Sequence, residues 1–510
     1  MPISPLSSDR TVDYVARKNV AFTRAHHCAY RGPGKALDYS RSDKSLRPPT
    51  KSTQSFELQN MPRAETLAAA HDPVVWRISR FSVTLSQLQY VTFTIIGVAL
   101  LWPWNCFLSA SAYYGERFLH TPSLMKVYSS TMMSVSTVTS TTYNYYLSQK
   151  QTGVDYKRRI NLGLSLTIAV FVVMAFSCVM NLFIKMPDFL FFFGLMGMVL
   201  VSSMATCLAQ NGTMATVNVM GQIYTNAVMV GQAIAGILPS IALIVSILLI
   251  GDKGHGKKPV EEDNRYVDKN FGLFVYYITA SLVSMASIAL LALIGYQKSE
   301  SMYRSLNELV SAEEGGLDDL EDIHVQKTHV PFNVLWSKLR AIVSTIFITF
   351  AVTLSFPVFA SIVESVHVDS HFVLLRKNIY IPFIYLIWNL GDLLGRIFCG
   401  ASKSRVLIRN PRTLIIYSVG RLVFIPLFLT CNIHPRGKLP IVSSDLWYIT
   451  LQFLFGFSNG QLITSCFMVV GDHCDTSEEK EAAGGFTSVF LSVGLAVGSI
   501  LSYLLVLLVD

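Results

Sequence analysis

The chain has 510 residues, of which 51% are hydrophobic and only 15% charged, with a formal net charge of +8 at pH 7. This composition is too apolar for an ordinary soluble enzyme and is typical of a polytopic membrane protein. The sequence contains no Walker A, GxSxG or HExxH pattern and no CxxC or clustered metal ligands. We therefore expect no enzyme activity, no cofactor and no metal.

Residues 1–84 are rich in Ser, Pro, Arg and Lys, and their basic residues outnumber their acidic ones. This pattern predicts a disordered, basic cytosolic tail. The tail is either a solvated segment without a specific partner or a sorting or phosphoregulated segment. It has no apolar core of the signal-peptide type, so we expect the first membrane span to act as the targeting signal.

Eleven apolar stretches reach the roughly 20 residues that a membrane-spanning helix needs. The predicted fold class is therefore an all-α polytopic membrane protein with eleven transmembrane helices. The predicted spans, with approximate boundaries, are 85–112, 123–147, 160–184, 188–212, 222–250, 272–296, 337–363, 379–400, 412–431, 444–470 and 484–509.

The longest internal polar segment, 297–336, contains the acidic run EEGGLDDLED and splits the spans into six and five. We predict an N-terminal six-helix bundle at 85–296, a cytosolic linker at 297–336 and a C-terminal five-helix bundle at 337–510. Two bundles joined in this way are typical of transporters with pseudo-symmetric halves. The basic loops 148–160 and 401–412 favour a cytosolic N-terminus by the positive-inside rule.

The first span contains Pro103 between two tryptophans, which predicts a bend in the helix. Trp102 and Trp104 fit an aromatic belt at the membrane interface. Trp104, however, lies well inside the apolar run, next to Asn105. Its indole is therefore also a candidate stacking face for an aromatic solute.

The fourth and fifth predicted spans are unusually rich in amide side chains. Most of these amides are expected to form hydrogen bonds between helices, and one or two to face a central cavity, where an amide presents both a donor and an acceptor. The amide residues are Gln210, Asn211, Asn218, Gln222, Asn226 and Gln232.

The eighth span, YIPFIYLIWNLGDLLGRIFCG, carries Asn389, Asp392 and Arg396 at spacings of three and four, which place them on one helical face. A charge at the bilayer centre costs about 2.5–3.5 kcal/mol even on the insertion scale. Two readings account for the charges: a structural ion pair between Asp392 and Arg396, or a polar site for a solute.

Two other spans carry notable residues. Phe356-Pro357 in the seventh span predicts a second bend. Arg421 in the ninth span is expected to snorkel to the interface or to pair structurally, rather than to bind solute.

Several motifs together resemble the equilibrative nucleoside transporter family. They are LLWPWNCF, MVGQAIAGILPS, WNLGDLLGR, RLVFIPLFLTCN, FGFSNG and EAAGGFTSVFLSVGLAVGS, and the resemblance covers nearly everything after residue 85. The run YVTFTIIGVALLWPWNCFLSAS and the later SFPVFAS are especially similar to the fungal vacuolar branch of the family. The resemblance implies eleven spans in a six-plus-five, major-facilitator-like arrangement, with alternating access and no obligatory ion coupling.

The resemblance also implies a substrate site. Trp104 matches a first-span Trp near the substrate, and Gln210 matches a fourth-span Gln that contacts the base. Asp392 and Arg396 match a pair that contacts the ribose and nearby groups. The remaining matched positions are apolar lining residues and one motif residue of structural character: Leu101, Leu108, Leu495 and Asn389.

We therefore predict facilitative transport of nucleosides, and also of nucleobases, across a vacuolar membrane. The expected partners are these solutes and the lipid bilayer, without nucleic acid. The alternatives are a proton-coupled nucleoside carrier, a major facilitator carrier of another small polar solute, and a membrane receptor that binds a ligand without moving it.

Overall fold

The computed structural model describes residues 74–78, 81–151, 153–250, 269–312, 329–367, 372–401, 406–433 and 441–509. The chain divides into two units, Met1–Ala70 and His71–Asp510, and all of the described residues belong to the second unit. The predicted tail up to residue 73 and the linker segment 313–328 lie outside the described residues.

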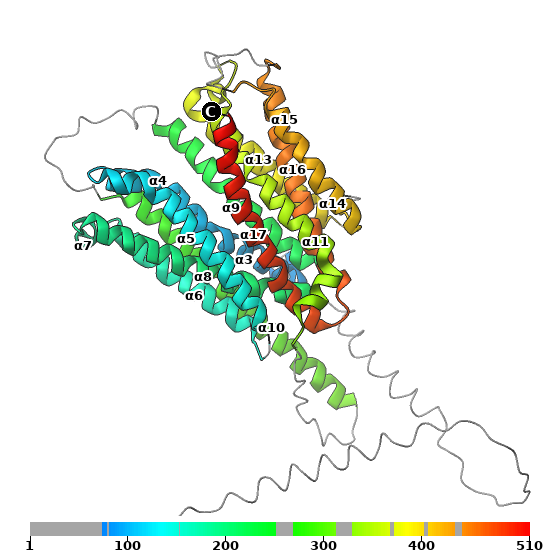
Figure 1. Cartoon of the computed structure of the whole chain (residues 1–510). Coiled ribbons are helices and arrows are strands. Elements are labelled where there is room, and N and C mark those ends of the chain that lie inside the picture. The colour runs from blue at the N-terminus through cyan, green and yellow to red at the C-terminus, as the bar shows by residue number, and fades with distance from the viewer. Residues whose placement is uncertain are drawn as a thin grey trace, which may run out of the picture. The chain divides into compact units, whose positions relative to one another are not determined.

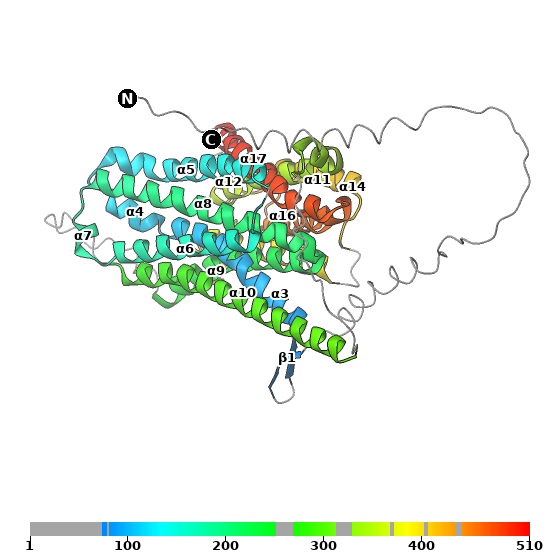
Figure 2. The ribbon, with the colours of Figure 1, turned by 90° about the horizontal axis from the view of Figure 1, so that it is seen from below.

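The end of the predicted tail forms a β-hairpin. Strands β1 (Val74–Ile78) and β2 (Phe81–Thr84) pair antiparallel, with Arg77 opposite Ser82. Their β-branched and aromatic residues favour strand structure, which the overall polar composition of the tail concealed. Helix α3 begins directly after β2, as Figure 2 shows, and the Thr84 side chain caps its first turn.

The helices before residue 313 form what we call the N-terminal set. Pro103 lies inside α3, and α10 continues well past its predicted end at residue 296. The set comprises α3 (Leu85–Ser109), α4 (Ser111–Arg117), α5 (Pro122–Gln149), α6 (Tyr156–Ser177), α7 (Asn181–Ile184), α8 (Asp188–Met220), α9 (Gln222–Ile250) and α10 (Phe271–Ala312).

The helices after residue 331 form the C-terminal set. The bend predicted at Phe356-Pro357 is a helix break at Leu354, between α11 and α12. The set comprises α11 (Phe332–Thr353), α12 (Ser355–Ile362), η2 (Val373–Leu375), α13 (Lys377–Gly400), α14 (Pro411–Gly420), η3 (Arg421–Val423), α15 (Phe424–Phe428), α16 (Asp445–Val469), η4 (Val470–His473) and α17 (Ser477–Val509).

Ten helical segments in the described part of the chain are long and apolar enough to cross a membrane. The predicted all-α membrane architecture is thus confirmed, but the count of eleven is not. The predicted span 123–147 corresponds to α5, which has 28 residues and is therefore long enough. Its many Ser and Thr side chains leave it less apolar than the other spans.

Successive long helices run up and down, so the described residues have two ends. We call the end that carries Lys150, Arg158 and Arg409 the basic end, and the opposite end the far end. Figure 1 shows the far-end tips at α7 and α15 well apart in the view, while α11 and α17 lie side by side near the basic end.

The buried apolar residues form separate cores at the two ends. The core at the basic end, which we call the shared core, combines residues of both sets, such as Phe93 and Val228 with Leu462 and Phe486. At the far end one core belongs to the N-terminal set and another to the C-terminal set. The two sets are thus joined by apolar packing at the basic end.

Candidate functional site

Helix α13 presents the predicted charged stripe toward the interior. Asp392 and Arg396 are only 3% and 8% exposed, and Arg396 Nε donates to Asp392 Oδ2 at 2.8 Å. The i,i+4 spacing on α13 allows this pair to form within one helix. The predicted ion pair is therefore present, and each charge has its counter-charge inside an apolar surrounding.

The same arginine joins the two helix sets. Arg396 Nη1 donates to the Met229 carbonyl on α9 at 2.9 Å, and the Asn226 amide of α9 donates to the Arg396 carbonyl at 2.7 Å. Arg396 Nη2 donates to no residue in the described part of the chain. The guanidinium thus bridges the sets and keeps donor capacity for another partner.

Small residues let α16 approach the pair closely. A Cβ added at Gly460 would lie 3.0 Å from the Asp392 Cα atom, so only glycine permits this contact between α13 and α16. The approach brings Asn459 to the carboxylate, where its amide donates to Asp392 Oδ1 at 2.6 Å. Both carboxylate oxygens therefore have a donor.

The amides predicted to connect helices do so at the basic end. The Asn218 amide donates to the Lys480 carbonyl at 3.2 Å, and the Gln222 amide contacts both oxygens of Asp472 at 2.7 and 2.8 Å. These bonds cross between the two sets, as does that of Asn226. They confirm the prediction of interhelical hydrogen bonds for three of the amides.

The two tryptophans of α3 have different surroundings. Trp102 is buried, and its indole donates to Thr279 of α10 at 2.8 Å. Trp104 is partly exposed, and its indole makes no hydrogen bond with the described residues. Asn105 beside it donates to the Ala235 carbonyl of α9 at 2.8 Å. Trp104 thus retains a free ring edge on a helix that is fixed to α9.

Asn389 also reaches α9. Its amide donates to the Tyr385 carbonyl of its own helix at 2.8 Å, and its carboxamide oxygen lies against Gly236. Because Gly236 follows Ala235 directly, Asn105 of α3 and Asn389 of α13 contact the same turn of α9. Asn389 therefore packs between helices, as its structural character in the motif implies.

The other predicted lining residues make none of the contacts with Asp392 or Arg396 described above, although α9 joins α3 to α13. Leu101 is partly buried on α3, and Leu108 further along the same helix is 45% exposed. Gln210 on α8 is partly exposed and makes no hydrogen bond with the described residues, and Leu495 is partly exposed on α17. The joint role of these residues in one site stays a prediction.

Arg421 does not snorkel, contrary to one of the two expectations. It is 1% exposed, and its Nε atom donates to Ser458 at 3.0 Å. Its guanidinium also lies over the Phe455 ring, 4.5 Å from the ring centroid. Sequence reasoning missed this burial because Arg421 occupies the short η3 segment, near the predicted cytosolic end of its span.

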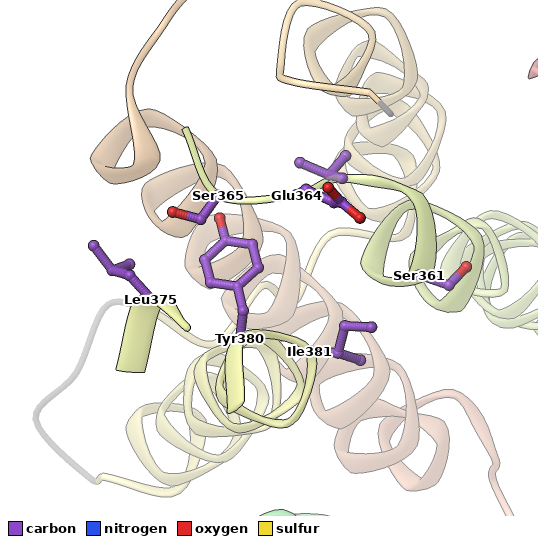
Figure 3. Close-up of a pocket in the computed structure, with 7 residues that line it drawn as sticks. Ser361, Glu364, Ser365, Leu375, Tyr380 and Ile381 are labelled. Carbon is purple, nitrogen blue, oxygen red and sulfur yellow. The ribbon is translucent and has the colours of Figure 1, made fainter. Parts of the chain in front are cut away.

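A small cavity of about 40 Å³ lies near the far end of the C-terminal set, away from the pair. Figure 3 shows the Tyr380 ring pointing its hydroxyl toward Ser365. Tyr380 and Asp392 are twelve residues apart on α13, or about 18 Å along the axis at 1.5 Å per residue. This cavity is too small and too distant to belong to the predicted solute site.

Comparisons with known proteins agree with the fold and the motifs. A family model described as nucleoside transporter matches residues 196–507. The nucleoside transporter FUN26 of Saccharomyces cerevisiae is 38% identical over 458 residues, covering 84% of this chain and 85% of that protein. The human equilibrative nucleoside transporter 1 is 25% identical, covering 81% of this chain and 96% of that protein.

A solved structure shares the fold. The proton:xylose symporter XylE, a major facilitator superfamily protein, superposes with a TM-score of 0.54 at 9% identity, covering 82% of this chain and 88% of XylE. At this identity the likeness concerns the fold alone, and it confirms the predicted major-facilitator-like arrangement. The family model and the yeast relative show the family: the chain belongs to the nucleoside transporter family, which includes the equilibrative nucleoside transporters.

Proposed function

We propose that this protein carries nucleosides, and also nucleobases, across a membrane by facilitated transport. The observation that carries the proposal is the Asp392–Arg396 pair, buried in the middle of a spanning helix with Arg396 Nη2 unused by the described residues. Ribose hydroxyls can donate to the remaining lone pairs of the carboxylate and accept from the free guanidinium N–H groups.

The flat base needs a different surface. Trp104 offers a partly exposed indole that pairs with no other described ring, and such a face suits stacking against a base. Gln210 carries an amide that is not used by the described residues and can read a base edge. In the proposed site, α3 and α8 contact the base and α13 contacts the sugar.

The mechanism that we propose is alternating access between the two helix sets. The shared core joins the sets at the basic end, whereas each set has its own core at the far end. This asymmetry fits a state that is closed at the basic end. The proposed location is an intracellular, vacuolar membrane with the basic end cytosolic, which rests on the sequence resemblance and on the basic loops. Fluorescent tagging tests it.

The function is tested by flux into liposomes. The purified full chain is reconstituted, and labelled uridine and adenosine are followed, with glucose and leucine as controls. We expect saturable flux of the nucleosides alone, driven by their own gradient. Absence of nucleoside flux under any gradient would refute the proposal. Flux that requires an imposed pH gradient would instead establish the proton-coupled alternative.

A further inference from the structure

Behind the ion pair, a chain of hydrogen bonds crosses the C-terminal set. The Asn459 amide on α16 donates to Asp392 Oδ1 at 2.6 Å, and Thr353 Oγ1 at the end of α11 donates to Asn459 Oδ1 at 2.7 Å. Arg421 Nη1 in turn donates to Thr353 Oγ1 at 3.2 Å. The chain thus connects α13, α16, α11 and η3 around one carboxylate.

The direction of each bond follows from the chemistry of its members. Arg421 can only donate, so the Thr353 oxygen must accept from it. The carbonyl oxygen of Asn459 can only accept, and the single proton of the Thr353 hydroxyl has two acceptors in reach, Asn459 Oδ1 at 2.7 Å and the Thr349 carbonyl of its own helix at 2.6 Å. The bond to Asn459 is the one that connects α11 to α16. The amide group of Asn459 is then left facing the carboxylate. Replacing the Thr353 hydroxyl would remove the donor that holds Asn459 in this orientation.

The members of this chain are buried together. Asn459 and Arg421 are 2% and 1% exposed, and Asp392 and Thr353 are 3% and 8% exposed. Among the described residues, no carboxylate lies within ion-pair distance of Arg421. Asp392 is therefore held by one guanidinium directly and is linked to a second one through two neutral side chains. Hydrogen bonds in such a buried chain polarise one another.

We propose that Thr353 and Asn459 are positioning residues for substrate binding, with Arg421 as their anchor. They hold Oδ1 of Asp392 on the α16 side, so that Oδ2 and the Arg396 guanidinium stay directed toward the sugar. Neither Thr353 nor Asn459 needs to contact the solute. The inference rests on the proposed function, because it concerns how Asp392 meets the ribose.

Thr353→Val tests the chain, because it removes the hydroxyl and keeps the side-chain shape. Thr353→Ser keeps the hydroxyl and serves as the conservative variant. Thr345→Val is the matched control: Thr345 lies on the same helix and is fully buried, and among the described residues its hydroxyl bonds only to the Ala341 carbonyl of its own helix. Folding of each variant is checked by thermal unfolding in detergent.

The readout is the apparent affinity for uridine and for 2′,3′-dideoxyuridine, which lacks the 2′- and 3′-hydroxyls of the sugar. We expect Thr353→Val to lower the apparent affinity for uridine about tenfold, the value of one hydrogen bond to a charged group. The apparent affinity for dideoxyuridine should stay nearly unchanged. Thr353→Ser and Thr345→Val should keep the wild-type ratio of the apparent affinities for uridine and dideoxyuridine. A merely structural defect would lower both affinities by the same factor.

Each outcome decides the inference. A Thr353→Val protein that keeps the wild-type ratio of the two affinities overturns it. If Thr353→Val does not fold, Asn459→Ser is judged by the same ratio. If the wild-type protein transports neither solute, the proposed function fails and the inference fails with it. If the wild-type protein transports uridine but the variants keep the wild-type ratio of the two affinities, the inference fails and the proposed function stands.

Discussion

The contact between α17 and α8 at the basic end gives a quantitative prediction for Gly484→Ala. A Cβ added at Gly484 would lie 2.6 Å from the backbone nitrogen of Ala215 and 2.8 Å from the Met214 carbonyl carbon. Ordinary contact begins at 3.4 Å, so the helices would have to separate by about 0.8 Å. Because the neighbouring atoms are backbone, no side-chain rotation relieves the clash.

This clash weakens the contact that holds the two helix sets together at the basic end. α17 belongs to the C-terminal set and α8 to the N-terminal set, and both contribute residues to the shared core. Overpacking of this kind costs about 1–3 kcal/mol. If the clash is relieved by parting the sets, the ratio of open to closed basic ends rises by roughly 5- to 150-fold. Thermal stability in detergent falls at the same time.

The assay is the rate at which a maleimide labels Cys466, which is fully buried in the shared core, with the site resolved by mass spectrometry. The matched control is Gly194→Ala on α8, where an added Cβ meets no atom within 4 Å. We expect faster labelling and a lower unfolding midpoint for Gly484→Ala only. Equal labelling and equal midpoints in the two variants would refute the packing argument.

Three further predictions concern individual side chains. We expect the variants Asp392→Asn and Arg396→Ala to fold but to lose most uridine flux, because each leaves a buried partner without its counter-charge. Wild-type flux in both variants would show that the pair is not part of the site. Trp104→Ala should raise the apparent KM for uridine more than it lowers expression, and the reverse pattern would assign the indole to packing. Asp445→Asn should lower the unfolding midpoint, because this carboxylate accepts from the His367 ring at 2.9 Å and is only 8% exposed; an unchanged midpoint contradicts this.

Local features of the structure were predictable from local sequence. Hydropathy and length located the spans, and the spacing of four between Asp392 and Arg396 was enough to predict their pairing. Helix α5 shows the limit of this approach. The sequence predicts it as the span 123–147 and it is helical, but its Ser and Thr content leaves it out of the ten described helices that are apolar enough to cross a membrane.

Contacts between distant segments were not predictable in the same way. Asn459 stands in the motif FGFSNG, and nothing in that motif states that its amide meets Asp392. The contact depends on the close approach of α13 and α16 at Gly460. Thr353 and Arg421 join the chain only because α11, η3 and α16 pack together. Hydrophobic periodicity identifies a buried face without identifying the helix that covers it.

The distribution of apolar packing limits how the proposed transport cycle can work. Opening the basic end exposes the shared core to water, whereas crossing hydrogen bonds such as that from Asn218 to Lys480 can be exchanged for water at small net cost. A cycle without an energy source therefore needs comparable apolar burial when the far end closes. Leu108, which lies one turn beyond Trp104 on α3 and is 45% exposed, provides surface of this kind. The residue predicted to line the solute path is thus also one that we expect to be buried in the opposite state.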